Sequence, residues 1–315
     1  MRYILRADAS PLIGSGHVMR SSVIAEELIA QGMEVVFLGK ISDLPWVSKR
    51  IDSLGFSQVL PSTENLISDP KSDVLILDSY TLPVDDVFIQ QKNWKAIVTI
   101  LDGYSPPYIS NLRIQLSLNC EAMGKFKIKT LCGPRYIPIR KTLKENSKLE
   151  ENDPLKILVV GGGANTFDFA IAIAYALEKI STTFNANIFT DSLVPKSFDS
   201  RFVFTRIGEI YDELTLSADL AFTTASTVCL ELIAQGVPIG IGCAVENQEQ
   251  FYRELSELNI AAPIGQFESG EWRINAETIS NLVNSKKLRR ELHLNAEGLI
   301  DFEGGKRIVK EILKL

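Results

Sequence analysis

Short runs of apolar residues, each followed by a loop and then by a segment with helical spacing, recur along the chain. The run Arg2–Arg6 predicts a buried strand, and apolar residues at three- and four-residue intervals in Val18–Ile29 predict a helix. Gly32 ends that helix, and the apolar run Glu34–Leu38 predicts the next strand. A strand, a loop, a helix and a second strand in this order indicate the start of a parallel sheet.

The same alternation continues through the first half of the chain. Asp73–Leu77 and Ala96–Leu101 predict two more buried strands, with a short helix at Val84–Gln91 between them. At Leu143–Asp153 the residues become charged, and large apolar side chains become rare before Pro154. This composition is typical of a linker, so we expect one domain to end here.

The pattern restarts after the linker with the strand Lys156–Val160, which three glycines follow. Further strands are expected near Ala186–Phe189, Phe202–Thr205, Leu220–Thr223 and Pro238–Ile241, with helices at Asp168–Ile180, Glu209–Ser217, Thr227–Gln235 and Lys286–Leu315. The sequence therefore predicts an α/β protein with two doubly wound, Rossmann-like domains, over residues 1–148 and 154–315. We expect the amphipathic C-terminal helix to pack back on the first domain.

The composition of the 315-residue chain agrees with two ordinary domains, since 45% of its residues are hydrophobic. No apolar run is long enough to span a membrane, and the start MRYILRADAS lacks the pattern of a secretory signal. We therefore expect a cytoplasmic protein. Its net charge of −6 and its pI of about 5.2 argue against a general nucleic-acid binder, which needs a basic face.

The four cysteines, at positions 120, 132, 229 and 243, form no CxxC pair, and the chain has only two histidines. A structural zinc site therefore lacks its ligands, and in a cytoplasmic protein we expect all four thiols to be reduced. Asp85 and Asp86 fall on the helix expected at Val84–Gln91, on the surface, and form no DxD-type metal motif. We expect no metal, no cofactor and no membrane partner, and a monomer is compatible with this picture.

The first candidate cluster is the stretch GSGHVMR, which includes Gly14, Gly16, His17 and Arg20, and we expect Gly14, Gly16 and Arg20 to contact the substrate. Glycines let the backbone approach a ligand closely, and ligands of open α/β sheets bind at the carboxyl ends of the strands. His17, at the start of the helix after the first strand, could act as a general base near neutral pH. The alternative is a histidine that caps or packs at the turn.

The second cluster, Asp78-Ser79-Tyr80, follows the DVLIL strand, and a further acid, Asp102, ends the next strand. In a parallel sheet all of these residues lie at the same edge as His17. They could contact a substrate or orient water. The alternative is a simple turn, because Asp and Ser are common turn residues.

Three more clusters lie in the second half. Gly161-Gly162-Gly163 lies between a strand and a helix and could hold a diphosphate on backbone amides, or could be an empty tight turn. The stretch TTAST, with Ser226 and Thr227, could bind phosphate, and Glu231, one turn into the helix, could bind ribose hydroxyls. The alternative is that Ser226 caps the helix and Glu231 is solvated. Asn247 and Gln248 could bind sugar hydroxyls or could form a polar first turn.

These clusters, in this order, resemble one family: the UDP-sugar hydrolases of the pseudaminic-acid pathway and the related spore-coat polysaccharide proteins. The matching stretches are RADASPLIGSGHVMR, LILDSYTLPVDD, CGPRYIPIR, VVGGGANT, TTASTVCLELIAQGVP and VENQEQ, between Arg6 and Gln250. The resemblance implies the GT-B architecture, in which two Rossmann-like domains enclose an interdomain cleft.

The resemblance also implies a reaction and a set of site residues. The family cleaves a UDP-linked 2,4-diacetamido-trideoxyhexose between the anomeric carbon and the diphosphate, with water as nucleophile and with inversion. His17 matches the general base, and Asp8 and Tyr80 match active-site loops. The positions that match nucleotide and sugar contacts are Gly162, Gly163, Ser226, Glu231, Asn247 and Gln248.

The chain is thus predicted to be a metal-independent UDP-amino-sugar hydrolase whose partner is a small-molecule nucleotide sugar. Two alternatives stay open. A GT-B glycosyltransferase would use an alcohol or amine acceptor in place of water, because fold alone does not specify function. A catalytically silent UDP-sugar binding protein would not need His17.

Overall fold

A computed structural model describes residues 1–61, 70–86, 89, 94–102, 108–120, 127–145, 151–163, 166–195, 197–208 and 210–315. The chain divides into two compact units, and each has its own seven-stranded sheet. The first unit comprises Met1–Arg140 together with Asp301–Leu315, and the second comprises Lys141–Ile300. No helix in the described part of the chain is long and apolar enough to cross a membrane.

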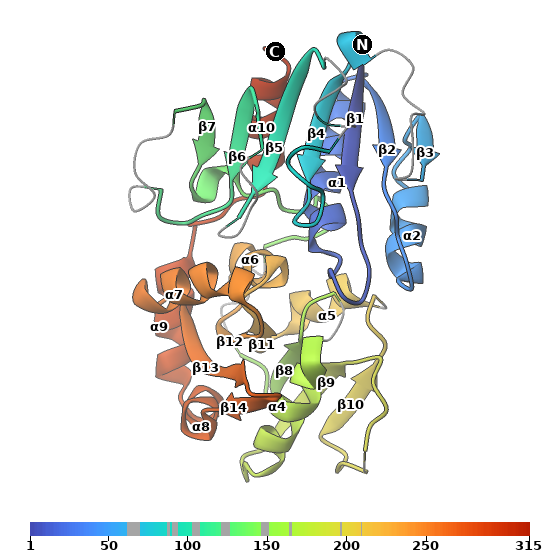
Figure 1. Ribbon diagram of the computed structural model, residues 1–315. Helices are drawn as coiled ribbons and strands as arrows, with labels where there is room; N and C mark the ends of the chain where they lie inside the picture. The colour runs from blue at the N-terminus through green and yellow to red at the C-terminus, as the bar shows by residue number, and fades with distance from the viewer. Residues whose placement is uncertain are drawn as a thin grey trace. The chain divides into compact units, whose positions relative to one another are not determined.

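The sheet of the first unit is entirely parallel and has the order β3-β2-β1-β4-β5-β6-β7 (Figure 1). Its central strands are runs of buried Val, Ile and Leu, as expected for strands covered on both faces. The order reverses between β1 and β4, and this switch point is where open α/β sheets bind ligands. The strands are β1 (Arg2–Ala7), β2 (Glu34–Leu38), β3 (Gln58–Leu60), β4 (Val74–Asp78), β5 (Ala96–Leu101), β6 (Leu112–Gln115) and β7 (Thr130–Cys132).

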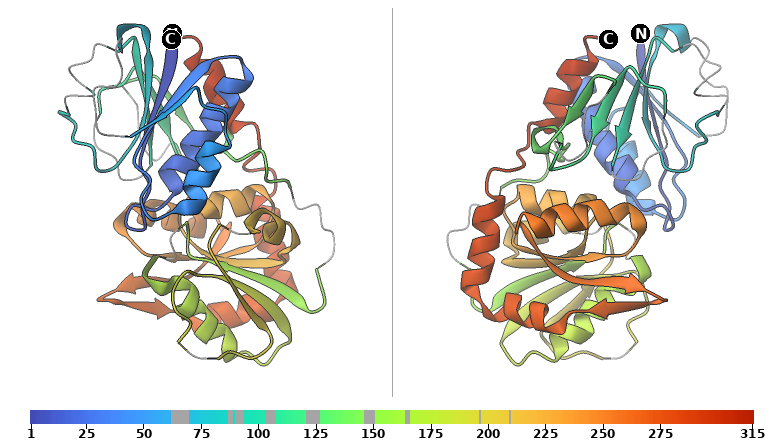
Figure 2. Two further views of the ribbon diagram at one scale, coloured as in Figure 1. Left: turned by 90° about the vertical axis from the view of Figure 1, so that its right-hand side faces the viewer. Right: turned by 60° about the vertical axis from the view of Figure 1, so that its left-hand side comes forward.

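Three helices cover one face of this sheet, namely α1 (Gly16–Ala30), α2 (Pro45–Asp52) and α10 (Gly304–Ile312) (Figure 2). Helix α10 packs against α1 and against the short 3-10 helix η3 (Pro134–Tyr136). A Cβ on Gly304 would lie 2.0 Å from the carbonyl oxygen of Ile137, so this close approach requires glycine. A second 3-10 helix, η1 (Pro70–Ser72), precedes β4.

The second unit repeats the design with the order β10-β9-β8-β11-β12-β13-β14, in which β14 alone is antiparallel to its neighbour. Its switch point lies between β8 and β11. The strands are β8 (Leu155–Val160), β9 (Phe184–Phe189), β10 (Phe202–Thr205), β11 (Leu220–Thr224), β12 (Ile239–Cys243), β13 (Ala261–Glu268) and β14 (Glu271–Ile274).

Helices cover both faces of this second sheet (Figure 1). On one face, apolar residues of α4 and α8 pack on alternate strand residues such as Ile157, Phe222 and Ile264. The helices and 3-10 helices of the unit are η4 (Thr166–Asp168), α4 (Phe169–Glu178), α5 (Tyr211–Ser217), α6 (Thr227–Ala234), η5 (Glu246–Gln248), α7 (Glu249–Glu257), α8 (Ala276–Asn284) and α9 (Lys286–Ala296).

The C-terminal segment differs from the single helix that we predicted at Lys286–Leu315. It forms two helices, α9 and α10, that belong to different compact units. Gly298, with a φ of +69°, lies in the break between them, and the left-handed conformation is one that glycine adopts without a steric penalty. Half of the helix predicted at Val84–Gln91 lies outside the described residues, and so do positions 146–150 of the predicted linker.

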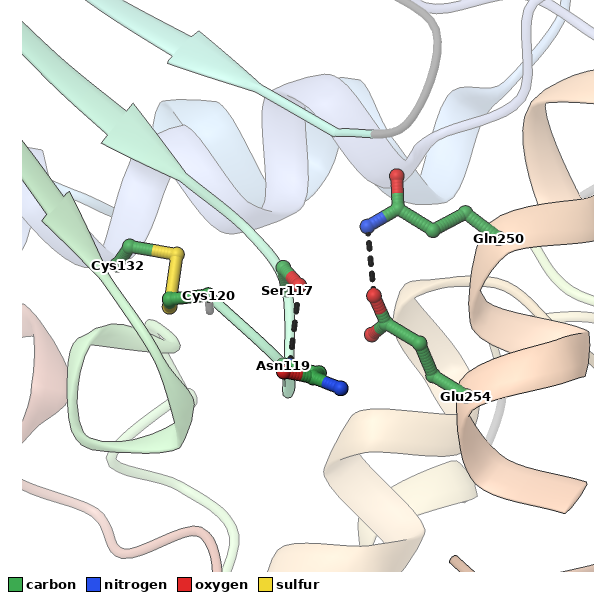
Figure 3. The surroundings of a disulfide bond; sticks show 6 residues. All are labelled: Ser117, Asn119, Cys120, Cys132, Gln250 and Glu254. Carbon is green, nitrogen blue, oxygen red and sulfur yellow. Dashed lines mark hydrogen bonds between the residues drawn. A yellow bond between two sulfur atoms is a disulfide. The ribbon is translucent and has the colours of Figure 1, made fainter. Parts of the chain in front are cut away.

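The prediction that all four cysteines are reduced is wrong for two of them. Cys120 and Cys132 form a disulfide that joins the segments at the carboxyl ends of β6 and β7 (Figure 3). Their Cα atoms are 5.9 Å apart because the two strands are neighbours in the sheet, which sequence separation does not reveal. Cys229 and Cys243 are free thiols and are buried, which raises the pKa of the Cys243 thiol to about 11.

Candidate functional site

The switch point of the first sheet brings together side chains from β4 and from the start of α1. Strands β1 and β4 pair in parallel, with Ala7 opposite Asp78, so both strands end at the same edge. Helix α1 begins at Gly16, after the loop that follows β1, and its first turn carries His17. The sequence therefore places His17 and Asp78 at the edge where ligands of such sheets bind.

His17 and Asp78 form a buried hydrogen-bonded pair. The Nδ1 atom of His17 lies 2.5 Å from Oδ1 of Asp78, and the two side chains are 4% and 1% exposed. Because an ionised carboxylate only accepts hydrogen bonds, Nδ1 carries the hydrogen and donates it to Asp78. The other ring nitrogen, Nε2, is then the atom with a lone pair, which is the arrangement that a general base requires.

Arg20 lies one helical turn after His17 and neutralises two carboxylates. Its Nε and Nη2 atoms donate to the two oxygens of Asp78, each at 2.6 Å, and Nη1 donates to Asp102 at 2.7 Å. Burial alone would raise the pKa of Asp78. The positive charge of Arg20, together with hydrogen bonds from Arg20 and His17, outweighs burial and holds that pKa at about 2. Asp78 is therefore ionised at neutral pH and keeps the His17 ring in one orientation.

Tyr80 belongs to this hydrogen-bond network, whereas Asp8 bonds to residues outside it. The hydroxyl of Tyr80 donates to Asp102, and its ring contacts His17 edge-on with a centroid distance of 4.2 Å. Asp8 accepts the backbone N–H of Lys40 at 2.7 Å and pairs with Arg6 at the same distance. Of the three predicted catalytic residues, the structure thus brings His17 and Tyr80 into direct contact.

In the second cluster, Asp78-Ser79-Tyr80, the alternative of a simple turn holds for Ser79 alone. The Oγ atom of Ser79 accepts the backbone N–H groups of Thr81 and Leu82, and therefore organises the turn after β4. Asp78 and Tyr80, on either side of it, belong to the network around His17.

The glycine loop before α1 has a defined shape. Gly14 has a φ of +84°, which favours glycine, and its N–H donates to the carbonyl of Ser10 at 2.7 Å. The Oγ atom of Ser10 accepts the N–H of Ile13 at 3.1 Å. These bonds close the loop into a tight turn that presents Gly16 at the first position of the helix.

The switch point of the second sheet joins the glycine run to the TTAST stretch. Gly162 follows β8 with a φ of +102°, and a Cβ at this position would lie 3.6 Å from Ser226 Oγ and 3.7 Å from Thr224 Oγ1. The hydroxyl of Thr224 donates to the carbonyl of Gly161 at 3.2 Å. Two loops that are about 60 residues apart in the sequence therefore lie against each other at this edge of the sheet. Positions 164 and 165 lie outside the described residues.

Helix α6 begins at the end of the TTAST stretch, at this switch point. Ser226 is the N-cap residue but its side chain makes no capping hydrogen bond, so the capping alternative is wrong. The first turn of α6 begins at Thr227, and the N-terminus of a helix favours an anion. Glu231 is 6% exposed, which excludes the alternative of a solvated side chain.

Asn247 and Gln248 occupy the 3-10 turn after β12. Gln248 is buried, and its carbonyl oxygen accepts the N–H of Ala244 at 2.8 Å, so it stabilises the turn that leaves the strand. Asn247 is half-buried. The side-chain oxygen of Gln248 therefore serves the turn itself.

Sequence reasoning did not predict that Asp78 and Asp102 share Arg20. Two signals in the sequence could have shown it. His17 and Arg20 are three residues apart on one helix face, and both acids end strands at the same edge. The missing information was that β1 neighbours β4, which only the sheet order supplies.

Among the residues that the structure describes, no group of three or more His, Cys, Asp or Glu side chains is arranged to hold a metal ion. The chemistry that these residues themselves offer is proton transfer at His17 and anion binding at the start of α6.

The chain resembles known proteins in sequence and in fold. No protein-family model matches the chain. It is 25% identical over 189 residues to the UDP-2,4-diacetamido-2,4,6-trideoxy-beta-L-altropyranose hydrolase of Campylobacter jejuni. The match covers 57% of this chain and 66% of that enzyme, which is slightly less than two thirds of its length. It confirms the resemblance that the sequence motifs indicated.

Solved structures show the fold. MurG of Acinetobacter baumannii matches with a TM-score of 0.65 over 100% of both chains, at 13% identity. The spinosyn rhamnosyltransferase SpnG, solved with thymidine diphosphate, matches with a TM-score of 0.68 over 100% of both chains, at 12% identity. A UDP-N-acetylglucosamine 2-epimerase matches with a TM-score of 0.61 over 100% of this chain and 96% of that one, at 12% identity. The protein has the two-domain GT-B type of α/β fold.

Proposed function

We propose that this protein hydrolyses a UDP-linked amino-deoxy sugar at the anomeric carbon, with inversion, and releases UDP and the free sugar. The observation that carries the proposal is the buried His17–Asp78 pair at the switch point of the first sheet. The similarity to a UDP-sugar hydrolase supports the choice of substrate and reaction. The free sugar would serve nonulosonic acid or surface polysaccharide synthesis.

In this proposal, His17 activates the attacking water. Nε2 accepts a proton as the water oxygen bonds to the anomeric carbon, and the bond between that carbon and the diphosphate oxygen breaks with its electron pair leaving on UDP. Asp78 holds the ring and stabilises the imidazolium that forms, while Arg20 keeps Asp78 ionised. Asp8 and Tyr80, which follow β1 and β4 at the same edge of the sheet, would orient the sugar.

The second unit would bind the nucleotide. Backbone amides at the glycine turn and at the start of α6 stabilise the charge on the departing diphosphate, a role that a metal ion performs in other enzymes. The proposed substrate contacts are Gly14 and Gly16 in the first unit and Gly162, Gly163, Ser226, Thr227, Glu231, Asn247 and Gln248 in the second.

A panel of UDP-amino-sugars tests the reaction. Incubated with the protein in EDTA and without any acceptor, one of them should release UDP and free sugar, with the opposite anomer visible first by NMR. Release that occurs only with an added alcohol or amine would instead assign the protein to the glycosyltransferases, which the structural neighbours include. Loss of release in EDTA that magnesium restores would contradict metal independence.

The Glu231→Ala variant tests the nucleotide site. Replacing this buried carboxylate should weaken UDP binding by about 1.5–3 kcal/mol, the range for hydrogen bonds that involve a charged group. Isothermal titration calorimetry on the full chain measures the change, with the exposed Glu257→Ala as control. An affinity equal to that of the wild type in a folded variant would remove Glu231 from the site.

A further inference from the structure

Two successive residues after the glycine turn adopt a strained backbone. Phe167 and Asp168 have φ values of +53° and +55°, in the left-handed region that residues with a Cβ rarely adopt. They lie at the end of η4, immediately before α4, and only two chain positions separate η4 from Gly163. A conformation of this kind persists only where neighbouring groups hold it, and it occurs preferentially at functional sites.

The antiparallel hairpin of β13 and β14 supplies those neighbouring groups. The indole N–H of Trp272, on β14, donates to the carbonyl oxygen of Phe167 at 2.9 Å. The ring of Phe167 stacks on Phe267, on β13, with a centroid distance of 4.2 Å and an interplanar angle of 8°. The strained segment is therefore held by one hydrogen bond and one stacked ring pair from the same hairpin.

Trp272 also holds the helix that follows. Its ring meets Phe169, the first residue of α4, edge-on at 4.9 Å, and meets Phe267 edge-on at 5.7 Å. A Cβ on Gly242, at the end of β12, would lie 2.8 Å from Phe169 and 3.0 Å from Trp272, so this side of the cluster is tightly packed. On the other side, Ser192 donates from Oγ to Asp168 at 2.5 Å.

We infer that Trp272 is a positioning residue for the glycine turn, and that its hydrogen bond to Phe167 sets the direction of the amides that receive the nucleotide diphosphate. This inference rests on the proposed function, in which Gly162 and Gly163 contact that diphosphate. It assigns a role to the hairpin, which adds the one antiparallel strand to an otherwise parallel sheet.

The Trp272→Phe variant loses the N–H donor and keeps a smaller aromatic ring, and comparing UDP with uridine separates a role at the diphosphate from the loss of packing. The full-length variant should bind UDP about 3- to 10-fold more weakly, the worth of one hydrogen bond. Binding of uridine, which has no phosphate, should stay unchanged when it is measured by competition against UDP. The control is Arg273→Ala, at the exposed neighbouring position on β14, which should leave both affinities unchanged.

Hydrogen exchange provides a readout that needs no ligand. In Trp272→Phe, the amides of residues 166–170 should exchange faster than in the wild type, while those of α8 should not change. If the wild type binds UDP but the variant loses UDP and uridine affinity equally, or loses neither, the positioning role is overturned. If the wild type fails to bind UDP, the proposed function fails. In that case the exchange rates decide the structural part of the inference by themselves. Faster exchange in Trp272→Phe would show that Trp272 holds residues 166–170, and unchanged exchange would show that it does not.

Discussion

The His17→Asn variant is expected to turn over its substrate about 10²–10⁴-fold more slowly than the wild type, which is the usual contribution of a general base. Asparagine can still bond to Asp78 but cannot accept the proton of water at neutral pH. The affinity for UDP should be unchanged, because the proposed nucleotide contacts lie mainly in the second unit. Initial rates and calorimetry on the same preparations measure the two effects.

His293 provides the matched control. It is the only other histidine, and its Nδ1 lies 2.7 Å from the carbonyl of Gly236 in the second unit, where it closes the end of α6. His293→Asn should retain wild-type turnover. Full turnover by His17→Asn would show that another group is the base.

The Arg20→Met variant is expected to lose about 3–5 kcal/mol of unfolding free energy at pH 7, the cost of leaving buried charges without a partner. Arg20 is 4% exposed and is the cation shared by Asp78 and Asp102, which are 1% and 5% exposed. Urea unfolding monitored by circular dichroism measures the loss. Arg307→Met is the surface control, since the pair Arg307–Asp301 is 30% and 45% exposed and should contribute less than about 1 kcal/mol.

The pH dependence of this effect has a definite sign. The folded pKa of Asp78, about 2, lies below the ordinary value of 3.8 for an aspartate, so its ionisation stabilises the fold above pH 4. That stabilisation is lost as the pH falls from about 4 through about 2. Arg20→Met lacks this stabilisation at every pH. The difference in unfolding free energy between the variant and the wild type should therefore be largest at neutral pH and should shrink towards pH 2. A difference that is constant over this window, or absent at pH 7, would show that the network does not carry this stability.

Much of the fold could be predicted because its signals are local. Apolar runs such as Glu34–Leu38, Ala96–Leu101 and Phe202–Thr205 coincide with the observed strands β2, β5 and β10. Strands with weaker signals were not predicted. These include β3, which has three residues and an exposed pattern, and β14, whose residues alternate between exposed and half-buried. Short or edge strands depend on their neighbours for pairing, and a local pattern does not show those neighbours.

The position of the candidate site could be predicted from the sequence, but the hydrogen bonds and ion pairs between its side chains could not. A glycine loop between a strand and a helix placed His17 at a carboxyl edge, and the GGG and TTAST stretches were placed in the same way in the second half. Arg20 was expected to contact substrate, yet its guanidinium is directed to Asp78 and Asp102. The direction of a long side chain depends on the charges around it, and those charges come from strands about 60 and 80 residues further along the chain.

The sequence by itself determined the two parallel α/β sheets, the glycine turns that follow their first strands and the edge at which the polar residues gather. Periodicity, strand–helix alternation and the freedom of glycine at positive φ are properties of short segments, so they can be inferred without the fold. The tertiary structure alone decided that β4 lies beside β1, which unites His17 with Asp78, and that Cys120 meets Cys132. It also decided that the β13–β14 hairpin holds Phe167. Each of these is a contact between distant segments, and its free energy depends on burial and partner geometry that exist only once the chain has folded.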